Sequence, residues 1–523
     1  MFIEDLSESA VTADSFVSMT KRLNNTAGAI TLSKDGEVGI HFSSNRMAWA
    51  YMKEDQITYG IERGKFIQLI ITSVGVGNKW NISDTTGFLV LVTAGRGKYG
   101  GFFITDPRTF YDTLCNRFQN ASRRISVASL YIGTGEMEKK LLQVTKANVL
   151  ENKKLKFNVL LDYQRGTRGV VNSKSLLQEF VEDVPERCNV FMYQTPRLQG
   201  SWSKAVPARY NELVALQHMK LYITDDSVLL SGANCSNDYF QQRQDRYVEI
   251  QDASLADFYC ELIDIVNSFS KESSKNGVKN NNVPKESFVQ DMKLKVEGFI
   301  DKWKERQAAI SQEDSEINTW VFPLVQMGEY SIKQDEQTTQ RIIESAPQHS
   351  HLKLATGYFN LTQQYADTLI NSQANISLLM AHPNANGFLG ASGPAGGIPH
   401  AYSLIARQFW DRVSRSNQCE RIQMLEYERP DWTFHAKGLW YYPPGSEFPF
   451  GTVVGSANLG ERSVHRDLEA QAAIFTVSPH LQKQLHDECR ELHKYSTECS
   501  NQLQERRIPL WVRATVGLFR TYF

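Results

Sequence analysis

The chain has 523 residues, of which 41% are hydrophobic and 22% are charged, and its formal net charge at pH 7 is -1. This ordinary composition excludes a disordered, collagen-like or coiled-coil protein. The nearly balanced charge argues against a polycation that coats nucleic acid, so we expect no nucleic-acid partner. A typical domain has about 150 residues, and the length therefore predicts two to four domains.

Cysteine usage and hydropathy narrow the class of protein further. The seven cysteines are scattered and form no Cys-x-x-Cys pair, so neither a disulfide framework nor a zinc site is predicted. No apolar run approaches the roughly 18 residues of a membrane-spanning helix. The opening residues, MFIEDLSESA, are acidic and resemble neither a secretory signal nor an arginine-rich transit peptide.

Changes in sequence texture divide the chain into six ranges. In the first, Ala29–Ser33 and Val38–Phe42 flank an Asp-Gly turn, which predicts a β-hairpin. Residues 65–100 show no hydrophobic period that would assign a structure. Residues 268–315 are rich in Lys, Asn and Ser and predict a polar linker followed by a helix. The third and fifth alternate helices with strands, such as a helix at Phe110–Ala121 and strands at Ile125–Tyr131 and Phe157–Asp162. In order, the ranges are 1–64, 65–100, 101–267, 268–315, 316–500 and 501–523.

The third and fifth ranges contain similar segments in the same order, which indicates an internal duplication. ISVASLYIG parallels LKLATGYFN, and NVLLD parallels SLLMA. Further along, LQHMK parallels TFHAK, and LLSGAN parallels VVGSAN. Short β-rich runs separated by helices predict an α/β fold in which each copy has a mixed sheet flanked by helices.

Each copy also carries the same polar residues at matching spacing. A His-x-Lys pair is followed by an Asn, and a carboxylate stands eleven residues after that Asn. Because alternate residues of a strand point to one face, we expect each His and its Lys to project together. The sets are His218, Lys220, Asn234 and Asp245 in the first copy, and His435, Lys437, Asn458 and Glu469 in the second. Asp225 completes a His-x-Lys-x4-Asp pattern in the first copy, whereas Tyr442 stands at that place in the second.

Two such sets fit phosphodiester chemistry. A neutral histidine attacks phosphorus and forms a covalent phosphohistidine, and a protonated histidine donates to the leaving oxygen. The lysines and asparagine amides stabilise the phosphoryl oxygens, and a carboxylate at each histidine fixes its tautomer. We expect no cofactor and no metal in the chemistry, while a dependence on divalent cations stays open. Asp245 and Glu469 could instead be ion-pair partners of nearby arginines, and Asp225 could be mainly structural.

These motifs resemble the phospholipase D superfamily, in which each of two halves supplies one His-x-Lys motif to a shared active site. More narrowly, residues 100–523 resemble the family of mitochondrial CDP-diacylglycerol–glycerol-3-phosphate 3-phosphatidyltransferases. The resemblance implies two phospholipase D-like domains in a pseudo-two-fold arrangement, and a missing Asp in the second motif is a feature of that family. The stretches that carry it include ASLYIGTG, LLDYQRGTRG, TPRLQG, LQHMKLY, LSGANCSNDYFQQRQDRY, NGFLGASGPAGGIPHAY, WTFHAKGLW and GSANLGERSVHRDLEAQ.

The resemblance implies a reaction in which CDP-diacylglycerol and sn-glycerol 3-phosphate give phosphatidylglycerophosphate and CMP, the committed step toward phosphatidylglycerol and cardiolipin. His218 would take the phosphatidyl group and His435 would protonate the departing CMP, although the reverse assignment is open. The implied location is the surface of the mitochondrial inner membrane. The alternatives are a phospholipase D-type hydrolase, a phosphatidylserine synthase that differs only in its acceptor, and a non-catalytic scaffold protein.

Arginines near the motifs are candidates for binding these anionic substrates. Two lie in RGTRG, directly after a predicted strand, where α/β sheets usually bind ligands. Others lie beside the Asn and carboxylate positions, where they could instead pair with local acids. The candidates are Arg165, Arg168, Arg243, Arg246 and Arg462.

The two ends of the chain differ from the rest. Ile508–Phe523 is aromatic and cationic and contains no acid, so we expect it to bind a membrane surface, the alternative being a docked core helix. At the other end, residues 20–64 resemble the C-terminal tail of an isoaspartyl peptidase/L-asparaginase without that family's catalytic Thr. We therefore expect no asparaginase activity, and we interpret residues 1–64 as a fusion or an artefact of the gene model.

Overall fold

The computed structural model describes residues 102–198, 214–308 and 318–522 apart from residues 276 and 281–282, together with short strands between residues 28 and 93. The chain forms two compact units, Met1–Asp84 and Thr85–Phe523. None of the helices in these described parts is long and apolar enough to cross a membrane.

Among its described residues, the first unit contains strands and no helix. Two of them pair antiparallel at the residues where the hairpin is predicted, and the turn between them, residues 33–37, lies outside the described residues. The other three form a separate antiparallel sheet. The strands are β1 (Gly28–Leu32), β2 (Val38–Phe42), β3 (Arg46–Lys53), β4 (Gln56–Glu62) and β5 (Ile67–Ile70).

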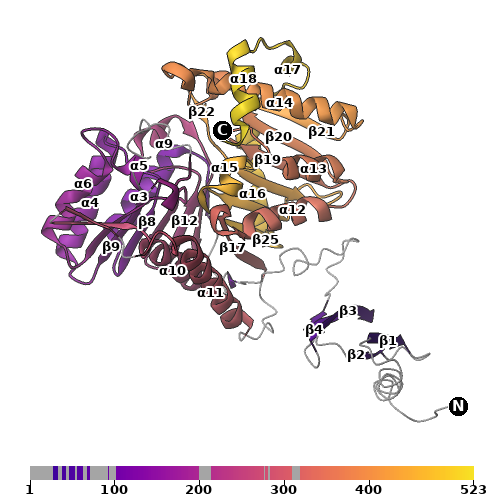
Figure 1. Ribbon diagram of the computed structural model, residues 1–523, viewed down its shortest axis with the longest axis horizontal. Coiled ribbons are helices and arrows are strands. Elements are labelled where there is room, and N and C mark those ends of the chain that lie inside the picture. The colour runs from indigo at the N-terminus through magenta and orange to yellow at the C-terminus, as the bar shows by residue number, and fades with distance from the viewer. Residues whose placement is uncertain are drawn as a thin grey trace. The chain divides into compact units, whose positions relative to one another are not determined.

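The second unit consists of two halves, each with one mixed sheet (Figure 1). The strands of the first half are β7 (Phe102–Ile104), β8 (Arg124–Ala128), β9 (Lys156–Asp162), β10 (Cys188–Tyr193), β11 (Leu221–Thr224), β12 (Ser227–Ser231), β14 (Tyr247–Gln251), β15 (Lys271–Ser274) and β16 (Gly277–Lys279). Their order in the nine-stranded sheet is β16-β15-β10-β9-β8-β11-β12-β14-β7. Strands β8, β9 and β10 are parallel, and the strands from β11 to β7 are antiparallel to their neighbours.

The second half repeats this topology. Its strands are β17 (Thr319–Met327), β18 (Ile332–Lys333), β19 (His351–Thr356), β20 (Asn375–Ala381), β21 (Ile422–Tyr427), β23 (Gly438–Tyr442), β24 (Gly451–Gly455), β25 (Leu468–Thr476) and β26 (Ser496–Glu498), and β6 (Val92–Thr93) pairs with β17. Read from its other end, the ten-stranded sheet has the order β26-β21-β20-β19-β23-β24-β25-β17-β18. Strand for strand, β8, β9, β11 and β12 correspond to β19, β20, β23 and β24. The duplication read from the sequence and the mixed sheets flanked by helices are thus confirmed.

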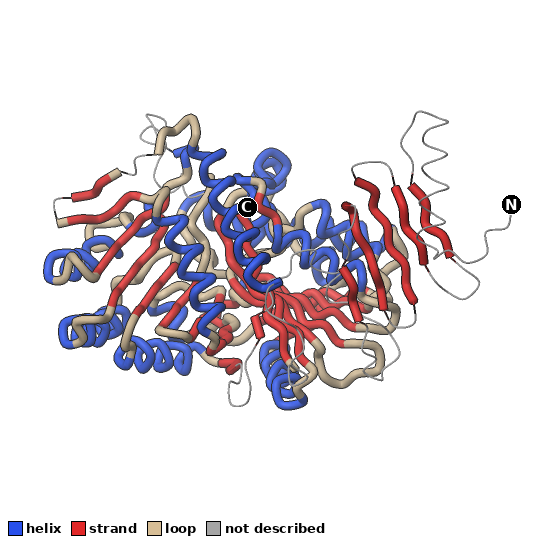
Figure 2. Tube along the Cα trace, turned by 90° about the horizontal axis from the view of Figure 1, so that it is seen from below, coloured by secondary structure: helices blue, strands red, loops and turns tan. Residues whose placement is uncertain are grey.

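Helices lie against the faces of both sheets (Figure 2). Those of the first half are α3 (Pro107–Asn120), α4 (Glu136–Glu151), α5 (Tyr163–Gly166), α6 (Ser173–Asp183), α9 (Asn237–Gln241), α10 (Ala253–Asn267) and α11 (Phe288–Ala308). Those of the second half are α12 (Gln334–Ser345), α13 (Gln363–Asn371), α14 (Ile398–Arg415), α15 (Glu461–His465), α16 (Pro479–His493), α17 (Gln502–Glu505) and α18 (Leu510–Phe519).

Helix α3 shows how the local sequence sets these elements. The Asp106 side chain caps the helix by accepting from the Thr109 amide at 2.8 Å, and Pro107 occupies the first turn, where its missing N–H costs nothing. Phe110, Leu114 and Phe118 are all buried, and their spacing of four places them on one face. The helix predicted at Phe110–Ala121 is confirmed, with an earlier start.

The range 268–315 differs in part from its prediction as a linker with a polar helix. Strands β15 and β16 extend the sheet of the first half at its edge. Helix α11 is polar on average but buries one face, with Phe288, Met292, Val296, Phe299 and Trp303 in the core. That face belongs to a hydrophobic cluster that also contains residues of β12, α10, β17, β24 and β25, so α11 helps to join the two halves.

Candidate active site

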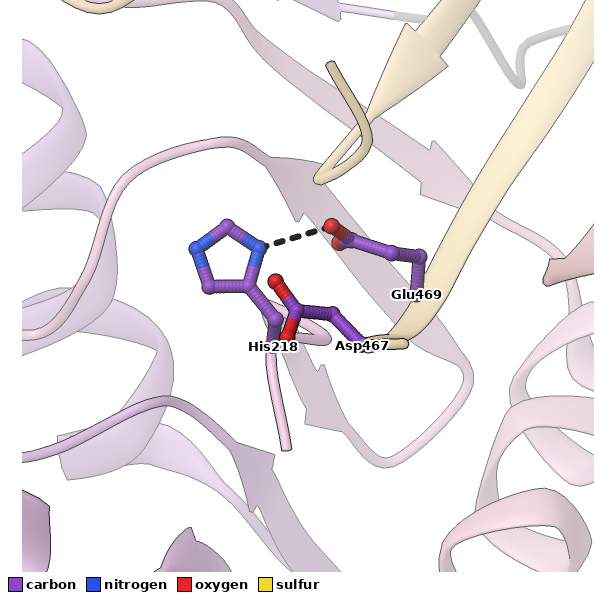
Figure 3. A group of neighbouring side chains, drawn as sticks. All are labelled: His218, Asp467 and Glu469. Carbon is purple, nitrogen blue, oxygen red and sulfur yellow. Dashed lines mark hydrogen bonds and ion pairs between the residues drawn. The ribbon is translucent and has the colours of Figure 1, made fainter. Parts of the chain in front are cut away.

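His218 lies in the seam between the halves, where it meets a carboxylate of the second half. Its Nδ1 lies 2.9 Å from Glu469 Oε1, and Figure 3 shows this pair beside Asp467. Two backbone hydrogen bonds of 2.9 Å hold the register, because the His218 amide donates to the Leu468 carbonyl and the Leu468 amide donates to the Leu216 carbonyl. Glu469 directly follows Leu468, so the backbone seam delivers its carboxylate to the ring.

The other histidine is held in the same way with the halves exchanged. His435 Nδ1 lies 2.7 Å from Asp245 Oδ2. Strands β13 (Arg243–Gln244) and β22 (Thr433–Phe434) pair in parallel between the halves, and the His435 amide donates to the Gln244 carbonyl at 2.8 Å. Each histidine is therefore oriented by the carboxylate of the opposite half, and neither half alone contains a complete site.

The His-x-Lys pairs precede strands rather than lying inside them. Lys220 is followed by β11, and His435 and Lys437 lie between β22 and β23. Each lysine Nζ donates to the carbonyl of its own histidine at 2.7 Å, and Lys437 Nζ also lies 3.2 Å from His435 Nε2. The predicted joint projection of His and Lys is therefore observed at the strand entrances.

Burial sets the protonation of this group. It lowers the pKa of both histidines well below the usual value, and the adjacent lysine of each set lowers it further. It also lowers the pKa of Lys220 to about 7 and of Lys437 to about 8, and it raises that of Asp245 to about 6. Such shifts favour neutral imidazoles, which suit an attack on phosphorus, and an anionic ligand would restore the charge on the lysines.

The two asparagines lie at equivalent places of the halves. Thr356 Oγ1 donates to Asn458 Oδ1 at 3.1 Å, and the same threonine contacts the Tyr358 carbonyl, as Ser129 contacts that of Tyr131. Asn234 is buried, and its Oδ1 has no hydrogen-bond partner among the described residues. Asn234 follows β12 and Asn458 follows β24, so the two asparagines stand at the same place after corresponding strands, and their role in the site stays a prediction.

Asp225 lies outside this group, which corrects its place among the catalytic candidates. It occupies the turn between β11 and β12 with φ of 50°, at the far end of β11 from Lys220. Its carboxylate accepts from the amides of Ser122, Arg123 and Arg124 at 2.8, 2.7 and 3.1 Å. The residue therefore fastens a turn, and the structural alternative holds for it.

Arg246 is likewise occupied elsewhere, which corrects its place among the substrate-binding candidates. Its guanidinium pairs with both oxygens of Glu488 on α16, at 2.8 and 2.9 Å. It also donates to Val453 and Thr452 at 2.9 Å each and lies 3.7 Å above the Trp440 ring. The side chain is 1% exposed, so it serves as a bridge between the halves.

The other arginines lie near the histidines or at the surface. Burial and Lys437 lower the pKa of His435 most, and Arg243 is the next cause of this lowering. Arg462 pairs with Asp467 at 3.1 Å. Arg165 lies 4.6 Å from the Tyr131 ring centroid. Arg168 is exposed.

Several tyrosines adjoin the site, and the sequence argument did not single them out. Tyr239 Oη lies 3.4 Å from His435 Nε2, and the Tyr358 ring lies edge-on to the same imidazole at 5.4 Å. Tyr131 and Tyr358 stand at the same position of the two repeated segments, which was a signal available in the sequence.

One trio of side chains has the composition of a metal site. Ligand atoms of His218, Asp467 and Glu469 lie within 4.8 Å of one another (Figure 3). Each acid already has partners, however: Ser456 and Ser463 donate to Glu469, and the Leu216 amide donates to Asp467 at 3.0 Å. Lys220 also acts electrostatically on both acids, and these contacts hold Glu469 and Asp467 beside His218.

Comparisons with known proteins extend this picture. A family model described as asparaginase matches residues 2–61. The chain is 39% identical over 461 residues to the mitochondrial CDP-diacylglycerol–glycerol-3-phosphate 3-phosphatidyltransferase of Gallus gallus, covering 80% of this chain and 83% of that protein. It is 38% identical over 457 residues to the Homo sapiens protein of the same name, covering 80% and 82%.

Among solved structures, the phosphatidylserine synthase of Haemophilus influenzae has a similar fold. Its TM-score is 0.62 at 20% identity, over 82% of this chain and 94% of that one. The likeness covers both halves, and at that identity it concerns the fold alone.

Proposed function

This chain belongs to the family of CDP-diacylglycerol–glycerol-3-phosphate 3-phosphatidyltransferases, and from that premise we propose that it moves the phosphatidyl group of CDP-diacylglycerol to sn-glycerol 3-phosphate through a phosphohistidine. The products are phosphatidylglycerophosphate and CMP. The observation that carries the proposal is the pair of histidines, one buried and one nearly so, each held at Nδ1 by a carboxylate, at 2.9 Å and 2.7 Å. With Nδ1 engaged, Nε2 is the nitrogen left to react.

The two displacements share one set of groups. In the first, Nε2 of neutral His218 attacks phosphorus, the bond to CMP breaks, and His435, which must be protonated on entering this step, gives its proton to the departing oxygen. In the second, His435 removes the proton of the incoming hydroxyl, whose oxygen attacks the phosphohistidine and frees His218. Lys220, Lys437 and the two asparagines face the phosphoryl oxygens throughout. The route uses side chains of this chain alone, and we propose that it needs no metal or other cofactor.

The test measures CMP release from CDP-diacylglycerol in mixed micelles by the full chain, with and without glycerol 3-phosphate. A phosphohistidine route also predicts exchange of labelled CMP into CDP-diacylglycerol without acceptor. We expect acceptor-dependent release, acceptor-independent exchange, and loss of both in His218→Ala and His435→Ala. Release that proceeds equally without acceptor would make the protein a hydrolase. Transfer without any exchange would contradict the covalent intermediate.

We also propose that the C-terminal helix α18 binds the membrane that holds the lipid substrate. Val512 and Val516 are buried, whereas Leu510 and Leu518 are 81% and 78% exposed. Trp511 packs on the Gly-rich segment, residues 386–399, because a Cβ on Gly397 would lie 2.1 Å from its ring. Half of the helix is thus anchored to the protein while its outer apolar side chains are available to a bilayer interface.

The relatives are named as mitochondrial proteins, and this supports a mitochondrial location. We propose that the chain is a peripheral protein of the inner membrane. Fractionation of cells that express the tagged full chain tests this, with release from mitochondrial membranes by alkaline carbonate as the expected result and recovery in the cytosol as the contrary one.

A further inference from the structure

A group of arginines and tyrosines lies on the His435 side of the site and has no part in the two displacements. Arg243 Cζ lies 4.5 Å from the Tyr239 ring centroid, and Arg243 Nε donates to Thr433 Oγ1 at 3.0 Å. Tyr239 Oη reaches His435 Nε2 at 3.4 Å. Arg243 is thus held in place by Thr433 and Tyr239, and only the Tyr239 side chain separates it from His435 Nε2.

Tyr358 is the centre of this group. Its ring lies 5.4 Å from His435 and stacks at 5.6 Å on Tyr402. Burial raises the pKa of the Tyr358 hydroxyl, and the guanidinium groups of Arg243, Arg462 and Arg165 each lower it. Three cations from three separate elements therefore act on one hydroxyl beside the catalytic histidine.

The acids around these cations do not balance them fully. Asp467 pairs with Arg462 at 3.1 Å, yet the buried Arg462 Nε has no hydrogen-bond partner among the described residues. Asp238 approaches Arg243 only to 4.0 Å, and its side chain is 67% exposed. A buried guanidinium nitrogen without an acceptor is costly, and an anion that accepts from it would remove that cost.

The Gly-rich segment approaches this group closely at Gly387. A Cβ on Gly387 would lie 3.2 Å from Arg243 Nη2 and 3.8 Å from Tyr358 Oη. A larger residue at this position would project between the guanidinium and the phenol. Gly387 therefore lets the segment lie against both groups without a side chain between them.

We propose that Arg243, Arg462, Arg165 and Tyr358 form a subsite for a phosphomonoester dianion, and that its ligand is the phosphate of the acceptor, glycerol 3-phosphate. The inference rests on the proposed function. A phosphomonoester carries about -1.5 to -2 charges at pH 7, which suits several guanidinium groups better than the single charge of a phosphodiester does. The subsite would make the enzyme select a phosphorylated acceptor over glycerol or serine.

The experiment compares the wild type with Arg243→Gln, Arg243→Lys and Tyr358→Phe in the full chain. We expect Arg243→Gln to raise KM for glycerol 3-phosphate about tenfold or more, the effect of losing a charged hydrogen bond, with KM for CDP-diacylglycerol changing less than about threefold. Its preference for glycerol 3-phosphate over glycerol should fall by a similar factor. Arg243→Lys should recover part of the affinity, and Tyr358→Phe should show a smaller loss. Arg108→Gln, which removes an exposed arginine on α3, is the control.

Exchange of labelled CMP distinguishes the other phosphomonoester of the reaction. If the variants raise the half-saturating CMP concentration in exchange and leave KM for glycerol 3-phosphate unchanged, the subsite holds the nucleotide and the acceptor assignment is wrong. If neither constant changes in variants with wild-type thermal midpoints, there is no anion subsite here. Absence of exchange in the wild type itself would instead overturn the phosphohistidine route, and the KM comparison would still decide the subsite.

Discussion

Arg243 and Asp467 occupy equivalent positions in the two halves and carry opposite charges. Each stands two residues before the carboxylate that its half sends to the opposite histidine. Arg243 faces Asp238 at 4.0 Å, and Asp467 pairs with Arg462 at 3.1 Å. Asp238 and Arg462 are also equivalent, so the duplication retains the pair of charges with reversed polarity. The pseudo-two-fold site is therefore electrostatically asymmetric.

This asymmetry predicts opposite pH shifts from two substitutions. Burial and Lys220 lower the pKa of His218 while Asp467 raises it, so Asp467→Asn should lower that pKa further. Burial, Lys437 and then Arg243 lower the pKa of His435, so Arg243→Gln should raise it. The measurement is the pH dependence of kcat/KM for CDP-diacylglycerol, whose two limbs report the essential base and acid.

The limb that moves identifies the role of each histidine. If His218 is the nucleophile, it must be neutral, and Asp467→Asn should move the acidic limb to lower pH. If it is the general acid, the alkaline limb should move to lower pH instead. If Asp467→Asn and Arg243→Gln each moved both limbs of the pH profile, and in the same direction, the effects would not be local to one histidine and this prediction would be contradicted. Lys483→Gln, an exposed change on α16, is the control for altered net charge.

The carboxylates that cross between the halves predict a loss of turnover without a loss of binding. Glu469→Gln and Asp245→Asn keep side-chain size but leave the imidazole orientation weakly fixed. We expect kcat to fall by up to about 10²- to 10⁴-fold, the usual contribution of a general acid or base, with KM nearly unchanged. Combined with His218→Ala, Glu469→Gln should add little further loss, because residues that act as a unit are not additive.

Glu249 offers a matched control for these two substitutions. It is a buried carboxylate on β14 that pairs with Arg117 at 2.6 Å and accepts from Ser227 at 2.7 Å. Glu249→Gln removes a buried carboxylate charge from β14, the strand that begins two residues after Asp245. A comparable fall in kcat from this variant would mean that the losses reflect damage to the sheet rather than to the histidines.

Much of this fold and site could be predicted from the sequence, because duplication repeats both the order of the strands and the spacing of the polar residues. Spacing along the chain says nothing about contacts between halves, however, so the exchange that pairs His218 with Glu469 could not be derived. Arg246 illustrates the same limit, since its partner Glu488 lies 242 residues away. The sequence places Asp225 among the catalytic candidates because it shares a motif with His218. Strand β11 lies between Lys220 and Asp225, however, so the two residues stand at opposite ends of that strand.

The turn at Asp225 predicts a loss of stability with little change in turnover. Asp225→Ala removes three acceptor contacts to backbone amides and places alanine at positive φ, so we expect unfolding to become easier by about 1–3 kcal/mol. Asp225→Asn should lose less, because Asn tolerates this backbone conformation. Thermal denaturation and kcat measured on the same samples decide the point. A large fall in kcat at a preserved midpoint would return Asp225 to the catalytic group.

The same turn gives a pH dependence of stability. Burial raises the pKa of Asp225, but the hydrogen bonds from Ser122, Arg123 and Arg124 outweigh it and the net pKa is lowered from 3.8. A carboxyl group whose pKa is lowered by folding stabilises the fold at every pH above its pKa in the unfolded state. That contribution is lost as the pH falls through its pKa in the folded state. The difference in thermal midpoint between wild type and Asp225→Asn should therefore shrink below about pH 4. A constant difference down to pH 3 would contradict this.

The bridge between Arg246 and Glu488 predicts a large destabilisation when one partner is removed. Their side chains are 1% and 4% exposed, so Glu488→Ala leaves a buried guanidinium without its charge partner. Such changes cost about 3–5 kcal/mol. Arg246→Met combined with Glu488→Leu should recover much of this loss, because no buried charge remains. Denaturant unfolding of the wild type and these two variants measures the loss and its recovery, and a Glu488→Ala loss below about 1 kcal/mol would show that water reaches this bridge.

The exposed face of α18 predicts that one substitution reduces membrane binding without affecting the site. Leu518 is 78% exposed on the outer face of the helix, and burying a leucine side chain is worth about 1.5–3 kcal/mol. Leu518→Glu should therefore weaken binding to vesicles that contain anionic lipid by about tenfold or more, and lower activity on vesicle-borne CDP-diacylglycerol. Activity in detergent micelles should change little, because micelles deliver the lipid without a bilayer. Leu294→Glu makes the same change at a leucine that is 56% exposed on α11, and an equal loss in both variants would show that charge alone, and not this helix, governs the binding.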